Sequence, residues 1–203
     1  MYISNIHQQI NFNKRLEATA AIIKHGKPIP CNIYSLERDK DINYFKDLVK
    51  DYNWDCGIYT PFADDNINTL KNGLFYVMEN QRGKCLGYTQ ISRENINNRN
   101  NDKAINILLL ETCPSYASHH RRRKGKYIGE TLIAFIAALA KRTNTDSVCV
   151  PYPAEPAYDF YTQNCDFEKY LFEQPRLILN RSKYDALLYR NEHHTKHKIE
   201  FKA

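Results

Sequence analysis

The sequence predicts a single α/β domain built on a mixed sheet, and three adjoining segments carry that prediction. Residues 105–110 are an apolar run of strand length, residues 121–129 form a basic loop with two glycines, and residues 130–140 are an apolar run of helical length. Glycines let backbone N–H groups approach an anion, and the first turn of a helix adds its partial positive charge. A strand, a basic glycine loop and a helix in this order therefore predict a phosphate-binding site.

The length and composition are those of one globular domain. The chain has 203 residues, of which 42% are hydrophobic and 26% charged, so it is long enough for one core and short for two domains. The net charge of +6 fits an anionic ligand, a nucleic acid or no special partner. Five of the basic residues crowd into residues 121–126, which concentrates the positive charge in the predicted loop.

The cysteines and the N-terminal residues predict a cytoplasmic protein with reduced thiols. The six cysteines lie far apart and form no Cys-x-x-Cys pair, so the sequence predicts no metal site. The first residues lack the charged and then apolar pattern of a signal peptide. No apolar run reaches the roughly 18 residues that a membrane span needs.

The N-terminal part of the chain is predicted to contribute an arm, a strand, a helix and a hairpin. Residues 1–30 have a weak helical pattern at Leu16, Ala20 and Ile23 and are expected to form an arm or extra helix. Residues 31–36 have the length of a short strand, and residues 39–52 have helical spacing. Residues 74–78 and 84–92, which flank a glycine-containing turn, predict a β-hairpin.

The C-terminal part is predicted to complete the sheet. After the central helix, which runs to residue 142, residues 147–152 predict a buried strand and residues 155–164 a short helix with proline at its start. Residues 167–172 and 177–179 predict two further strands. The domain is expected to span residues 31–190, and the basic residues 191–203 are expected to form a mobile tail. This order gives a mixed, mostly antiparallel sheet flanked by helices, with a parallel crossover around the central helix.

The central loop, in this order of elements, resembles the GNAT (GCN5-related N-acetyltransferase) family. That family binds the diphosphate of acetyl-CoA with a loop of the form Q/R-x-x-G-x-G/A, and this chain has KGKYIG followed by the family's Gly-x-x-Leu helix start. One register places Lys124 at the Q/R position, Tyr127 at the first glycine and Gly129 at the last. A second register begins at Arg122, keeps Gly125 as the first glycine and places Tyr127 at the last glycine position.

A second motif downstream is also similar to the family. The sequence AYDFYTQNCDF, which begins at residue 157, resembles A-x-x-F-Y-x-x-x-G-F, but Asp166 replaces the glycine and one residue is extra. In the family, the tyrosine at the position of Tyr161 often serves as general acid. The resemblance covers residues 31–189 and implies a GNAT-like sheet in which the central parallel strands splay apart.

The resemblance implies an N-acetyltransferase that takes acetyl-CoA as its cofactor and an amine as its acceptor. Tyr161 is the predicted general acid, because a phenol with a pKa of about 10 keeps its proton at neutral pH. A core tyrosine is the alternative. Glu111 is the predicted base, with bridging water or a surface carboxylate as alternatives. The predicted cofactor contacts come from the strand end and the loop: Leu110, Thr112, Arg122, Arg123, Lys124, Gly125, Lys126, Tyr127, Ile128, Gly129 and Glu130.

The sequence leaves the acceptor and the partners open. The acceptor amine belongs to a small molecule, a protein or an aminoacyl-tRNA, and the basic loop is expected to make at most weak contact with nucleic acid. The oligomeric state is also open, a homodimer included. The alternative from another class is a nucleic-acid-binding protein on a degenerate GNAT-like scaffold, which the tyrosine at a glycine position favours.

Overall fold

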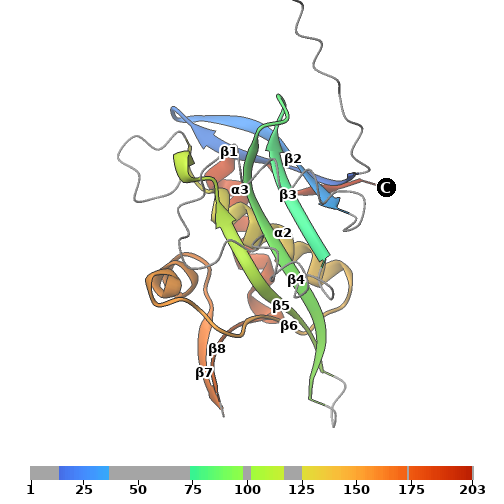
Figure 1. Cartoon of the computed structure of the whole chain (residues 1–203), viewed down its shortest axis with the longest axis vertical. Coiled ribbons are helices and arrows are strands. Elements are labelled where there is room, and N and C mark those ends of the chain that lie inside the picture. Colours follow the sequence, from blue (N-terminus) through green and yellow to red (C-terminus); the bar gives the residue numbers. More distant parts are fainter. Residues whose placement is uncertain (1–13, 37–73, 98–101, 117–124, 173, 203) are drawn as a thin grey trace, which may run out of the picture.

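The computed structural model describes residues 14–36, 74–97, 102–116, 125–172 and 174–202, which form one sheet with helices against it (Figure 1). The strands of this part of the chain are β1 (Arg15–Lys24), β2 (Lys27–Leu36), β3 (Leu74–Asn80), β4 (Cys85–Asn97), β5 (Asp102–Thr112), β6 (Ser147–Val150), β7 (Glu168–Phe172), β8 (Gln174–Asn180) and β9 (Glu200–Phe201). Its helices are α2 (Ile128–Arg142) and α3 (Tyr184–Thr195), with single turns η2 (Pro114–Tyr116), η3 (Glu155–Ala157), η4 (Phe160–Asn164) and η5 (Arg181–Lys183). The predicted helix at residues 39–52 lies outside the described residues.

The sheet is mixed and mostly antiparallel, as the sequence predicts. Among the described residues its order is β7-β8-β6-β5-β4-β3-β2-β1-β9. Every neighbouring pair is antiparallel except β5 and β6, which run parallel on either side of the α2 crossover. The β1–β2 and β7–β8 hairpins lie at opposite ends of the sheet, and α2 and α3 lie together on one of its faces (Figure 1).

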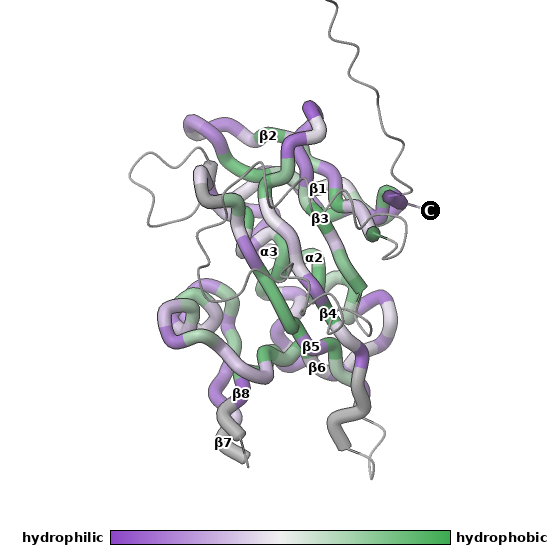
Figure 2. The backbone as a smooth tube through the Cα atoms, viewed as in Figure 1, coloured by the Kyte–Doolittle hydropathy of each residue, from purple (hydrophilic) through white to green (hydrophobic). Residues whose placement is uncertain are grey.

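The central helix α2 is buried on all sides because it lies between the sheet and α3. Seven consecutive residues, Thr131, Leu132, Ile133, Ala134, Phe135, Ile136 and Ala137, are buried. A helix that is apolar all round belongs inside a core. Apolar residues accordingly concentrate on α2 and the central strands, whereas the turns are hydrophilic (Figure 2). Lys141 and Arg142 in the last turn are favourable to the helix dipole.

The prediction of an arm or extra helix at residues 1–30 is wrong for residues 15–30, which form strand β1, a turn and the start of β2, and residues 1–13 lie outside the described residues. Ala18, Ala20 and Ile22 are buried at a spacing of two residues, which is the period of a strand. His25 and Gly26 both have positive φ, 51° and 75°, and join β1 to β2 as a two-residue hairpin turn. Residues 25–26, which belong to the predicted arm or extra helix, therefore form a turn within the sheet.

The expectation of a mobile tail at residues 191–203 is also wrong. Helix α3 continues to Thr195, and β9 then pairs with β1 through Ala18 opposite Phe201. The ring of Phe201 lies 5.6 Å from that of Phe135 on α2, and the Arg142 guanidinium lies 5.1 Å from the Phe201 ring centroid. Apolar contact anchors the C-terminal residues to the core despite their basic composition.

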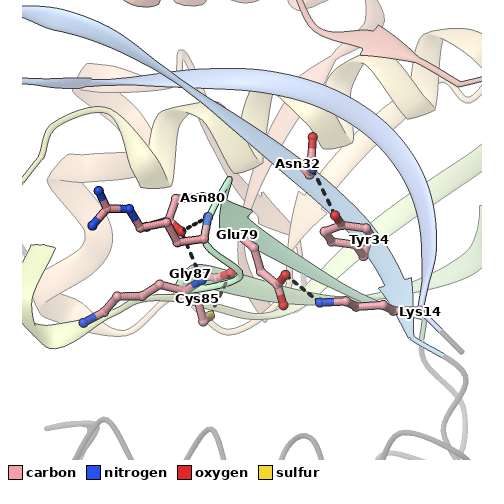
Figure 3. Close-up of polar contacts among 9 residues, drawn as sticks. Lys14, Asn32, Tyr34, Glu79, Asn80, Cys85 and Gly87 are labelled. Carbon is pink, nitrogen blue, oxygen red and sulfur yellow. Dashed lines mark hydrogen bonds and ion pairs between the residues drawn. The ribbon is translucent and has the colours of Figure 1, made fainter. Parts of the chain in front are cut away.

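A buried carboxylate at the end of β3 is neutralised by an ion pair. Glu79 is only 2% exposed, and its Oε2 lies 2.6 Å from the Nζ of Lys14 (Figure 3). The same Nζ lies 4.6 Å from the ring centroid of Tyr34, whose hydroxyl accepts a hydrogen bond from Asn32 Nδ2 at 3.0 Å. Because a buried charge is costly unless it is paired, these contacts join the residue before β1 to β2 and β3.

No helix in the described part of the chain is long and apolar enough to cross a membrane. The five cysteines in this part, Cys31, Cys85, Cys113, Cys149 and Cys165, are buried and unbridged.

We expect the free energy of unfolding to fall above about pH 9. Burial raises the pKa of the Cys31 thiol from 9.0 to about 12, and burial also raises the pKa values of Cys85 and Tyr161. Above their ordinary pKa values these groups lose a proton in the unfolded chain and keep it in the folded one. Each such group then lowers stability by about 1.4 kcal/mol per pH unit.

Urea titrations between pH 7 and pH 10.5 measure this slope. The Cys31→Ala variant serves as the control, because it removes one of the groups and should show a shallower decline. A free energy of unfolding that is constant or rises above pH 9 would contradict the expectation.

Candidate active site

The parallel strands β5 and β6 lie side by side over only a short stretch. Pairing runs from Ala104 opposite Ser147 to Asn106 opposite Cys149, and β6 ends one residue later at Val150. Strand β5 continues through residues 107–112 with no β6 partner. Within the described residues, this edge of β5 therefore leaves backbone N–H and C=O groups for a ligand that carries amide groups.

A β-bulge marks the point where the two strands diverge. Gln90 of β4 pairs with Leu109, whereas the next residue, Ile91, pairs with Ile107, so Leu108 is an extra residue in β5. The side chain of Leu108 is 40% exposed. Bulges change the direction of side chains and occur often beside active sites. The apolar run at residues 105–110 has no period that could reveal this bulge in the sequence.

Helix α2 begins beside the divergent half of β5. Gly87 of β4 is labelled in Figure 3. A Cβ added to it would lie 2.7 Å from the Glu111 carbonyl oxygen and 3.0 Å from Ile128 Cγ2. The absence of a side chain at Gly87 therefore allows β4, β5 and the first residue of α2 to meet.

The first turn of α2 has the donors that a diphosphate requires. Its first intrahelical hydrogen bond runs from the Thr131 N–H to the Tyr127 carbonyl at 2.8 Å, and no side chain caps the helix. The N–H groups of Ile128, Gly129 and Glu130 consequently have no acceptor within the helix. Three such groups at the positive end of a helix dipole are suited to an anionic phosphate, and the contact with acetyl-CoA that the sequence predicts here stays a prediction.

The backbone at Gly125 favours the first of the two loop registers. Tyr127 stands at a glycine position in both registers, and its φ is 69°, in the left-handed region that glycine adopts most easily, whereas Gly125, the first glycine of the second register, has no positive φ. Tyr127 thus has the conformation of a glycine at the position where the family's loop has its first glycine. Gly125 instead packs against β1, since an added Cβ would lie 3.2 Å from Ile22 Cδ1.

The other predicted cofactor contacts have different environments. The N–H of Lys126 donates to the Ile23 carbonyl at 2.8 Å, so only its exposed side chain is left for an anion. Leu110 and Thr112 are half-buried on the divergent half of β5, and Leu110 packs against the core. Arg122, Arg123 and Lys124 lie outside the described residues.

The predicted base, Glu111, is half-buried on β5. It pairs with Tyr88 of β4 across the sheet. Because successive side chains of a strand point to opposite faces and Leu110 packs against the core beneath α2, Glu111 projects from the other face.

The predicted general acid, Tyr161, lies in an aromatic cluster on η4, a single turn of π-helix. Its ring is 6% exposed and makes edge contacts with Phe160 and Phe167, with ring centroids 5.1 and 5.4 Å away. Burial, followed by the nearby Cys165 thiol, raises the pKa of Tyr161, so the hydroxyl keeps its proton at neutral pH.

The π-helix also accounts for the irregularities of the second motif. A π-turn contains one residue more than an α-helical turn, and η4 lies where the motif has its extra residue. Asp166, which replaces the family's glycine, has a φ of 57° and so keeps the left-handed backbone.

The two predicted halves of the site are in contact. A Cβ built on Gly129 would lie 2.9 Å from Phe160 Cζ, so the Phe160 ring packs against the first turn of α2. Asn164 Nδ2 donates to Glu130 Oε1 at 3.5 Å. Tyr161 is thereby placed beside the helix end that fits a diphosphate.

A pocket of about 280 Å³ adjoins this contact, and sequence reasoning missed its third wall. Tyr127 and Glu130 of the first α2 turn and Asn164 of η4 line two sides. Helix α3 supplies the third side with Arg190, Asn191 and His194. No signal in the sequence joined α3 to the loop, because the two segments are about 60 residues apart.

Comparison with known proteins identifies the fold. No model of a protein family and no curated protein matches the chain. Among solved structures, the AtaT toxin bound to acetyl-CoA and the C-terminus of the antitoxin AtaR is similar with a TM-score of 0.55 and 16% identity, over 78% of this chain and 98% of that one. AtaTR bound with acetyl-CoA gives a TM-score of 0.56 and 18% identity, over 77% and 97%. An N-acetyltransferase from Staphylococcus aureus Mu50 gives 0.52 and 16%, over 75% and 98%.

The chain therefore has the fold of the GNAT acetyltransferases, which confirms the predicted architecture.

Proposed function

We propose that this protein is an acetyl-CoA-dependent N-acetyltransferase in which an amine attacks the acetyl group directly. One observation carries the proposal: the divergent half of β5, with its bulge at Leu108, ends beside the uncapped first turn of α2. A strand edge that continues beyond β6, next to N–H groups without an intrahelical acceptor, suits a long ligand that has amide groups in its middle and a diphosphate at one end. Similar structures of the same fold contain acetyl-CoA, which supports this choice of ligand.

Acetyl-CoA, when bound, supplies an acetyl group activated as a thioester. The N–H groups of Ile128, Gly129 and Glu130 would receive the diphosphate, and the part of β5 that extends beyond β6 would orient the amide groups along its edge. A backbone N–H of the divergent β5, around Leu110–Thr112, donates to the carbonyl oxygen on which negative charge develops.

Tyr161 and Glu111 move the protons in this proposal. Tyr161 donates its hydroxyl proton to the leaving sulfur. Because its pKa is raised, the hydroxyl is protonated over the whole neutral pH range and is able to donate. Glu111 accepts the proton of the acceptor amine, directly or through a water molecule.

The acceptor that we propose to test first is an amine carried by a polyanion, such as an aminoacyl-tRNA. The net charge of +6 and the basic run at residues 121–126 favour such an acceptor over a cationic one. AtaT, one of the proteins of the same fold, is described as a toxin. A protein amine and a small-molecule amine are the alternatives for the same assay.

The second candidate function is nucleic-acid binding on a GNAT-like scaffold without acetyl-CoA. The basic run favours it, and a structure of the KacTA–DNA complex has the same fold, with a TM-score of 0.52. The tyrosine at a glycine position of the loop supports nucleic-acid binding less than the sequence alone indicated, because Tyr127 still has a left-handed backbone.

Thermal and chemical unfolding discriminate between the two functions. Acetyl-CoA at 100 times its Kd is expected to raise the free energy of unfolding by about 2.7 kcal/mol, since it binds only the folded chain. An RNA oligomer should bind with a Kd no tighter than about 10⁻⁶ M at physiological salt. Nanomolar RNA binding without any stabilisation by acetyl-CoA would favour the nucleic-acid-binding function over the acetyltransferase function.

A further inference from the structure

Two residues of the proposed site hold a backbone conformation that is unfavourable for them. Tyr127, just before the first turn of α2, has a φ of 69°, and Asp166, just after η4, has a φ of 57°. Residues other than glycine rarely adopt this left-handed region, because Cβ approaches the following carbonyl, although aspartate tolerates it better than tyrosine does. Each residue adjoins a proposed functional group, since Tyr127 precedes the free N–H groups and Asp166 follows the turn of Tyr161.

One face of α3 contacts both of these residues. The Arg190 guanidinium forms a bidentate ion pair with the Asp166 carboxylate. Its Nη1 lies 3.0 Å from Oδ1 and its Nη2 lies 3.0 Å from Oδ2. Nη2 also donates to the carbonyl of Asn164, the last residue of η4, at 2.7 Å. One turn further along α3, the His194 ring stacks on Tyr127, with centroids 4.7 Å apart and planes 23° from parallel.

A buried hydrogen bond fixes α3 between these two contacts. Asn191 Nδ2 donates to Thr131 Oγ1 at 3.2 Å, and both residues are buried. The Thr131 hydroxyl in turn donates to the Ala21 carbonyl of β1 at 3.3 Å. Residues three and four apart lie on the same helix face, so Arg190, Asn191 and His194 act from a single surface of α3.

We infer that α3 is a positioning clamp for both halves of the site, and this inference rests on the proposed acetyltransferase function. Arg190 holds Asp166 in its left-handed conformation and thereby fixes the turn that carries Tyr161, whose carbonyl accepts from the Phe167 N–H at 3.1 Å. His194 holds Tyr127 in the same conformation and thereby fixes the direction of the N–H groups that receive the diphosphate. Neither α3 residue is a catalytic residue.

The clamp predicts separate effects for its two ends. Arg190→Ala should lower kcat by about tenfold and leave the Kd of acetyl-CoA nearly unchanged, because only the turn of Tyr161 is released. His194→Ala should raise the Kd of acetyl-CoA by about tenfold and leave kcat nearly unchanged. Isothermal titration measures the affinity without turnover, and a CoA-release assay measures kcat.

Glycine in place of Asp166 or Tyr127 tests whether α3 acts by holding these residues in the left-handed conformation. Glycine adopts the left-handed region without cost, so Asp166→Gly should restore kcat in the Arg190→Ala protein, and Tyr127→Gly should restore affinity in the His194→Ala protein. The crossed pairs, Arg190→Ala with Tyr127→Gly and His194→Ala with Asp166→Gly, are the matched controls and should not be restored. If Arg190→Ala does not fold by circular dichroism, Arg190→Lys replaces it, since it keeps the charge and loses the fork.

The outcomes separate this inference from the function beneath it. A wild-type protein that binds acetyl-CoA and turns over, but whose matched glycine pairs are not restored or whose crossed pairs are restored equally, would show α3 to be only a scaffold. A wild-type protein that binds no acetyl-CoA would overturn the proposed function, and the clamp with it.

Discussion

Replacing Tyr161 by Phe is expected to lower kcat by a factor of about 10² to 10⁴, the usual range for losing a positioned proton donor. That factor corresponds to roughly 3–5 kcal/mol of activation free energy. The variant removes one O–H and keeps the ring, so the edge contacts with Phe160 and Phe167 remain and the fold is retained. The loss should appear in kcat more than in acetyl-CoA affinity, because the hydrogen bond strengthens as charge develops on the sulfur.

The measurement is a CoA-release assay, first run over a panel of amine, peptide and tRNA acceptors with the wild-type protein. Tyr158→Phe is the matched control, since Tyr158 precedes the same turn and its ring lies under Lys169, 4.8 Å from Nζ to the centroid. Tyr158→Phe should turn over at the wild-type rate. If Tyr161→Phe also does so, Tyr161 is a core tyrosine and water protonates the leaving group.

The central part of the fold is predictable from the sequence because local pattern and tertiary structure agree there. The hairpin of β3 and β4, the strand β5 and the helix α2 each have a clear period or apolar run, and the structure has all of them. The ends of the chain are different. The spacing of Leu16, Ala20 and Ile23 fits a helix, but pairing of β1 with β2 and β9 satisfies its backbone and buries Ala18, Ala20 and Ile22 instead.

The candidate site is predictable only in its outline. The motifs locate Gly129 and Tyr161 on α2 and η4, but they leave the register of the loop open, and only the backbone conformation at Gly125 favours one register. The bulge at Leu108 depends on which residues β4 offers across the sheet. The contacts of α3 depend on the packing of a helix about 60 residues further along the chain, for which a single sequence carries no local signal.

The position of Gly129 explains why a charge there should affect binding and not folding. Gly129 is the second residue of α2, where a carboxylate is favourable to the helix dipole by about 0.3–1 kcal/mol. An added Cβ would lie 2.9 Å from Phe160 Cζ, at the far end of a half-buried side chain that is able to shift. An aspartate at this position would therefore occupy the N–H groups of the first turn itself.

Gly129→Asp is accordingly expected to weaken acetyl-CoA binding by a factor of about 100 or more in isothermal titration, while circular dichroism and the unfolding midpoint remain those of a folded protein. The carboxylate competes with the diphosphate for the same donors and repels it, and like charges about 4 Å apart near a protein surface cost about 4 kcal/mol. Gly129→Ala is the matched control, because it adds the same Cβ against Phe160 without the charge and should weaken binding by at most about tenfold. Equal losses in the two variants would assign the effect to Phe160, and unchanged affinity in both would place the diphosphate away from α2.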